Sequence, residues 1–87
     1  MDKIIDNLLA SKLIGFDFVC SNVNITFSMK DYTVTEDRDN YVIVSDFGEV
    51  VIGKEPNKVI DESEINVAYS IFYDNCELYI SFPEIPA

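Results

Sequence analysis

Carboxylates are the reactive side chains that this sequence offers in greatest number, with 16 Asp and Glu among 87 residues and no histidine. Without histidine, the chain lacks the commonest general base, the commonest transition-metal ligand and every catalytic triad built on imidazole. A pair of carboxylates can still act as acid and base or hold a metal ion. The acids available for such a site are Asp31, Glu36, Asp37, Asp46, Glu49, Asp61, Glu62 and Glu64. Their spacing selects no pair, so we expect no catalytic residue, no metal site and no cofactor.

The two cysteines, Cys20 and Cys76, lack the Cys-x-x-Cys spacing of redox and metal-binding motifs. The first segment carries Asp2 and Asp6 where a secretory signal is basic, and no apolar run reaches the ~20 residues of a membrane helix. We therefore expect a cytoplasmic protein whose cysteines are reduced and unbridged, each beside a different hairpin turn.

The net charge of −10 is concentrated in two acidic blocks. Residues 31–49 hold six acids and one base, and residues 61–87 hold six acids and no base. Such a chain repels nucleic acid and anionic lipid, so we expect no direct nucleic-acid binding, no membrane binding and a basic protein as partner. We also expect the two blocks to meet on one side of the molecule.

Apolar residues of the first segment recur every three or four positions, as in an amphipathic helix. They are Ile4, Ile5, Leu8, Leu9 and Leu13. Because glycine commonly occupies the position after a helix end, Gly15 is expected to terminate this helix.

Apolar and polar residues alternate in two later segments, and each time the parity changes at a short polar turn. The first predicted hairpin turns at Ser21-Asn22, which places Phe18 opposite Ile25. The second hairpin has the same form and turns at Asp74-Asn75.

The run Tyr41 to Val44 is apolar at every position, which predicts a strand covered on both faces at the centre of the sheet. A turn follows it, where Gly48 can adopt a positive φ. Residues 54–64 are polar and are predicted to form a surface loop. The chain as a whole, residues 1–87, is predicted to be a single α+β domain. In it, an N-terminal helix packs on a twisted, mostly antiparallel meander sheet of about six or seven strands.

The far face of the terminal hairpin carries Phe72 and Tyr79 among acids. Aromatic residues are enriched at binding hot spots, and they also stack across strands in ordinary sheets, so both interpretations stay open.

From small size, acidity and the lack of catalytic groups we expect a non-catalytic inhibitor of a basic protein, either a toxin nuclease or another nucleic-acid-binding effector. Bacterial immunity proteins, antitoxins and phage anti-defence proteins such as anti-CRISPRs form this class, and the acidic blocks would act as a nucleic-acid mimic. The expected partner-binding residues are Glu36, Asp37, Asp39, Asp46, Glu49, Asp61, Glu62, Glu64, Phe72, Asp74, Glu77 and Tyr79.

Two other functions are compatible with the same residues. One is a small structural or assembly subunit, with a homodimer joined through the second apolar face of the central hairpin. The other is an enzyme that uses the carboxylates named above.

Overall fold

A computed structural model describes all residues from Met1 to Ala87. One helix is followed by eight strands: α1 Asp2–Ala10, β1 Leu13–Cys20, β2 Val23–Lys30, β3 Thr33–Glu36, β4 Asn40–Ser45, β5 Gly48–Gly53, β6 Lys58–Asp61, β7 Asn66–Phe72 and β8 Cys76–Pro86. The protein is therefore an α+β fold, as predicted.

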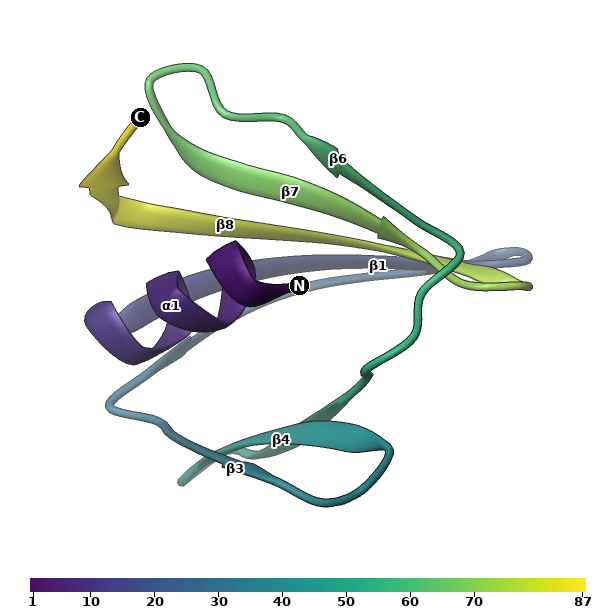
Figure 1. The fold of residues 1–87 in the computed structure, drawn as a ribbon, viewed down its shortest axis with the longest axis horizontal. Coiled ribbons are helices and arrows are strands. Elements are labelled where there is room, and N and C mark those ends of the chain that lie inside the picture. The colour runs from purple at the N-terminus through teal and green to yellow at the C-terminus, as the bar shows by residue number, and fades with distance from the viewer.

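The strands form two antiparallel sheets where a single meander sheet was expected. The larger sheet has five strands in the order β2-β1-β8-β7-β6, and the smaller has three in the order β3-β4-β5. In Figure 1 the smaller sheet lies below the larger one, and α1 lies between them at one end. The pairing of β1 with β8 joins the first and last strands of the chain, which is the step that a meander order lacks.

The hairpins themselves have the predicted registers. Phe18 lies opposite Ile25 in the β1–β2 hairpin, and Ile71 lies opposite Leu78 in the β7–β8 hairpin. Two-residue turns with alternating apolar positions determine these registers, because a slip by one residue would move every apolar side chain to the other face.

The core fills the space between the two sheets and α1. Its side chains come from one face of the larger sheet, from α1 and from the smaller sheet, and they are Ile4, Leu8, Ile14, Phe16, Met29, Ile43, Ile52, Tyr69, Ile71, Leu78, Ile80 and Phe82. Because all covering elements lie on this inner face, the opposite face of the larger sheet has no layer over it. The only helix, α1, has nine residues, and no helix is long and apolar enough to cross a membrane.

The helix is shorter than predicted. It ends at Ala10, Leu13 begins β1, and Leu9 is 68% exposed. Gly15 does not cap the helix but lies in β1 opposite Ser81. A Cβ atom at Gly15 would lie 2.7 Å from the Ser81 hydroxyl oxygen, so the close approach of β8 explains this glycine.

Two further predictions are corrected. β4 is the middle strand of the smaller sheet, and only one of its faces is buried: Ile43 is fully buried, whereas Val44 is 37% exposed. The segment 54–64 is not only a loop, because Lys58–Asp61 forms β6 at the edge of the larger sheet.

Candidate protein-binding surfaces

The outer face of the five-stranded sheet has a regular grid of side chains that follows from the strand registers. Its middle row crosses the sheet from Thr26 through Asp17, Tyr79 and Ser70 to Ile60. The row on one side consists of Ser28, Gly15, Ser81 and Ala68, and the row on the other consists of Asn24, Val19, Glu77, Phe72 and Lys58. Tyr79 therefore stands at the centre of this face, which we call the outer face; no second sheet or helix packs on it, although Ala68 and Ser70 are buried in it.

The row beside Tyr79 consists of small residues, and a hollow lies on each side of the tyrosine. One hollow of about 490 Å³ lies over β1 and β2, with Gly15, Ser28 and Ser81 in its lining. The other, of about 380 Å³, lies beside the β6–β7 loop, where Glu62 and Glu64 line it. Tyr79 lines both hollows, and Glu62 and Glu64 line one of them. Aromatic residues in such settings are enriched among binding hot spots.

Phe72 lies diagonally across from Tyr79 on the same face, one strand away. Its neighbours in the grid are Glu77 on β8 and Lys58 on β6. Phe72, Glu77 and Tyr79 are all half-buried, so this part of the outer face is partly shielded from solvent. Thus the structure does bring together the predicted aromatic residues and Glu77.

Several predicted acidic residues have structural partners instead. Glu36 forms the only salt bridge of the chain, with Lys54. Asp37 accepts hydrogen bonds from the backbone N–H groups of Asp39 and Asn40, at 2.9 and 2.8 Å. These bonds lower the pKa of the Asp37 carboxyl group and fix the β3–β4 turn.

Asp61 and Asp74 also accept hydrogen bonds within the chain, Asp61 in its own turn and Asp74 from the connection between β5 and β6. Asp61 accepts a 2.8 Å hydrogen bond from the backbone N–H of Ser63, and bonds to Ser63 lower its pKa. Asp74 accepts a 2.7 Å hydrogen bond from the side chain of Asn57. Among the predicted binding acids, those left for a partner are Asp39, Asp46, Glu49, Glu62, Glu64 and Glu77.

The acidic blocks do not meet on one side of the molecule. In Figure 1 the β3–β4 turn, with Asp37 and Asp39, lies at the bottom, and the β6–β7 loop, with Glu62 and Glu64, lies at the top. Both sheets lie between them. The acids of the first block therefore do not adjoin the outer face, whereas Glu62, Glu64 and Glu77 of the second block do.

The sequence did not predict a second surface, an apolar groove between the two sheets. It has a volume of about 390 Å³, and eight of its ten lining residues are hydrophobic. The walls come from the inner side of the larger sheet and from β5, and they include Phe18, Ile25, Phe27, Val50, Val51 and Leu78. Glu49 and Tyr73 supply polar atoms at its margin. Alternation alone assigns these side chains to a core, because it does not show that the smaller sheet leaves part of the inner face open.

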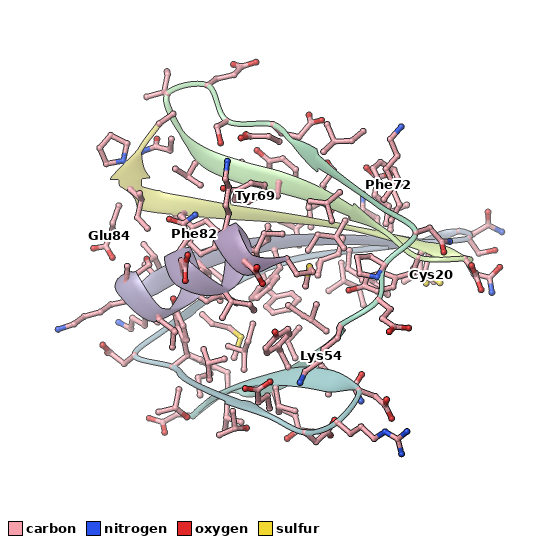
Figure 2. All side chains as sticks on the ribbon, viewed as in Figure 1. Cys20, Lys54, Tyr69, Phe72, Phe82 and Glu84 are labelled. Atoms are coloured by element: carbon pink, nitrogen blue, oxygen red, sulfur yellow. The ribbon has the colours of Figure 1, made fainter.

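Cys20 and Cys76 lie next to each other near this groove, at the end of the larger sheet where Figure 2 labels Cys20. Both are free thiols, directly opposite each other on β1 and β8. Each cysteine does lie beside a different hairpin turn, as predicted, but the pairing of β1 with β8, which was not predicted, brings the two turns and their thiols together. Hydrogen bonding to the Cys20 thiol and burial raise the pKa of Cys76.

Comparison with known proteins adds no relative to these observations. No protein-family model, curated protein or solved structure matches the chain. No three cysteine, aspartate or glutamate side chains are gathered as a metal site.

Proposed function

We propose that this protein is a small acidic inhibitor that binds a basic, nucleic-acid-handling protein through the outer face of its larger sheet. The observation that carries the proposal is the position of Tyr79, at the centre of the outer face, between two hollows and beside acidic residues. The net charge of −10 would draw a basic partner toward this face and disfavour anionic ones.

The two parts of the surface would act at different stages of binding. Long-range attraction between opposite charges speeds encounter, whereas buried aromatic anchors slow dissociation. Glu62, Glu64 and Glu77 are therefore assigned to association, and Tyr79 with Phe72 is assigned to the lifetime of the complex. Bacterial immunity proteins and phage anti-defence proteins are the classes that this mode of action resembles, with acidic side chains in place of nucleic acid phosphates.

The test is capture of a partner from a lysate of the source cell, followed by surface plasmon resonance at low and high salt. Tyr79→Ala should speed dissociation, with a loss of roughly 1 to 4 kcal/mol as for other aromatic anchors. The matched control is Phe47→Ala, which removes an aromatic that is 83% exposed in the β4–β5 turn and should change nothing.

The charge contribution is tested separately by the triple variant Glu62→Gln, Glu64→Gln and Glu77→Gln. It should slow association at low salt and have little effect at high salt. An association rate that changes neither with salt nor with these substitutions would contradict charge-directed inhibition.

A structural subunit that acts through self-association is the second candidate. It is favoured by the apolar residues exposed on the smaller sheet, where Val44 is 37% and Val51 is 54% exposed. Sedimentation equilibrium separates the two functions: a dimer that Val44→Lys dissociates would support the subunit, and a monomer would oppose it.

A further inference from the structure

The strand β2 is an edge without the usual protection against pairing with another chain. It lies at the end of the five-stranded sheet, and its eight residues pair with β1 along their whole length without a bulge. Natural edge strands are commonly shortened, bulged, or interrupted by proline or charge. β2 contains no proline, and its single charge, Lys30, is its last residue. The other edge of this sheet, β6, has only four residues.

The backbone groups of β2 that face solvent can be identified from the ladder. A hydrogen bond from Asp31 N–H to Lys12 carbonyl continues the β1–β2 pairing, so Val23, Ile25 and Phe27 direct their backbone groups toward β1. The N–H and C=O groups of Asn24, Thr26 and Ser28 therefore point away from the sheet, where an added strand would meet them.

The side chains of β2 extend the apolar groove to this edge. Val23, Ile25 and Phe27 point to the inner side and are 53%, 48% and 37% exposed. Ile25 and Phe27 form one wall of the groove, and Val50 and Val51 of β5 form the other. β5 is itself the edge of the smaller sheet, so the groove opens between two sheet edges. An exposed apolar patch of this kind marks an interaction site.

Charge decides which chain would occupy this site. A second copy of the protein carries the same net charge of −10, so two copies repel each other. On its outer side β2 presents Asn24, Thr26, Ser28 and, at its last residue, Lys30. At the middle of the strand the Thr26 hydroxyl donates a 3.2 Å hydrogen bond to the carboxylate of Asp17 on β1. Glu49 lies at the margin of the groove. Both acids would contact basic side chains favourably.

We propose that the groove and β2 together accept an extended segment of a basic protein, which adds as a sixth strand beside β2. Its backbone would pair with Asn24, Thr26 and Ser28. Alternate side chains would be apolar and enter the groove, and the side chains between them would be Lys or Arg and lie toward Asp17 on the outer side. This proposal rests on the proposed function, since it specifies how a basic partner is held.

The probe is a short capped peptide that alternates valine and lysine over the length of β2. The control peptide has the same composition with the valines and lysines in two blocks, so it keeps the charge and loses the alternation. Isothermal titration should give the alternating peptide an affinity at least about tenfold higher, a difference of about 1.4 kcal/mol. Hydrogen exchange measured by NMR should show new protection at the amides of Asn24, Thr26 and Ser28.

Thr26→Pro tests the pairing, because it removes an outward N–H group that takes no part in the β1–β2 ladder. The matched control is Val59→Pro on β6, whose N–H also points away from the sheet, since the ladder continues through the Glu62 N–H to Ala68 C=O bond. Thr26→Pro should abolish peptide binding and Val59→Pro should preserve it. Ile25→Asn, which leaves the backbone intact but makes one groove wall polar, should weaken binding as well.

Equal affinity for the two peptides, undetectable binding of both, or protection on another strand would overturn the strand-addition site. Retained, salt-sensitive binding of the captured basic protein by Thr26→Pro would also overturn it while leaving the proposed function intact. Loss of that complex in Tyr79→Ala, with peptide binding unchanged, would support two separate contact regions.

Discussion

At the scale of single residues, Cys20 and Cys76 are two reactive side chains that lie directly opposite each other. The backbone N–H and C=O groups of Cys20 point toward β2, and those of Cys76 point toward Tyr73. Neither cysteine therefore forms a backbone hydrogen bond to the other, and the two are a non-hydrogen-bonded pair between β1 and β8. Such pairs bring Cα atoms to about 4.5 Å, within the range that a disulfide spans. The hydrogen bond to Cys20 therefore raises the pKa of Cys76 while both thiols remain reduced.

Removing the Cys20 thiol should make the Cys76 thiol more reactive. The hydrogen bond to Cys20 is the largest cause of the raised pKa of Cys76, and a raised pKa means less thiolate at neutral pH. Cys20→Ala should therefore speed alkylation of Cys76 by iodoacetamide, and the pH midpoint of that reaction should fall. Mass spectrometry of the alkylated peptides measures the rate. Cys20→Ser keeps a hydrogen-bonding group and should give a smaller change; identical pH midpoints in the wild type and Cys20→Ala would contradict the coupling.

At the scale of elements, a hydrogen bond from Tyr73 links the two sheets beside the groove. Its hydroxyl donates a 2.9 Å hydrogen bond to the carbonyl of Gly53, the last residue of β5. Tyr73 is at the β7–β8 turn of the larger sheet, so this bond joins elements that share no ladder. Burial raises the pKa of Tyr73 from 10.0 to about 12.

The Tyr73 bond should contribute stability that is lost in alkali. The unfolded state releases the phenol proton near the ordinary pKa of 10.0, whereas the folded state holds it to about 12. The contribution is therefore complete below pH 10.0 and declines as the pH rises through about 12. Tyr73→Phe should lower the free energy of unfolding by about 0.5 to 1.5 kcal/mol at neutral pH and flatten the alkaline decline. Urea titrations across this range measure both effects, with Tyr79→Phe as the matched control. An unchanged alkaline slope in Tyr73→Phe would show that the phenol is not held between the sheets.

The elements that the sequence predicts well are those determined by local signals. The β1–β2 and β7–β8 hairpins follow from a two-residue turn and a change of parity, and both registers are correct. The separation into two sheets depends on the pairing of β1 with β8, residues far apart in the chain, and no local pattern encodes that choice. For the same reason Tyr79 and Phe72 could be placed on one face from the sequence, whereas the groove between β2 and β5 could not.

At the scale of the whole molecule, charge repulsion outweighs charge attraction. The chain has 16 acids and 6 bases, and only Glu36 and Lys54 form a salt bridge. The molecule extends 29 × 29 × 23 Å, so acids at opposite ends are separated by more than the screening length of about 10 Å at 0.1 M salt. At low salt they repel one another across the fold, and unfolding relieves that repulsion.

Added salt should therefore stabilise this protein. Raising sodium chloride from about 0.01 M to about 0.1 M shortens the screening length from about 30 to about 10 Å, which removes most of the repulsion between distant acids. The Glu36–Lys54 pair on the surface is screened too, but such a pair adds little to stability, because water and side-chain entropy offset its attraction. We expect the urea midpoint at neutral pH to rise with salt, and to rise less in the triple variant Glu62→Gln, Glu64→Gln and Glu77→Gln, which carries less charge. A midpoint that falls with salt would mean that attractive pairs govern the stability and that the acidic surface carries no destabilising excess charge that binding to a basic partner could relieve.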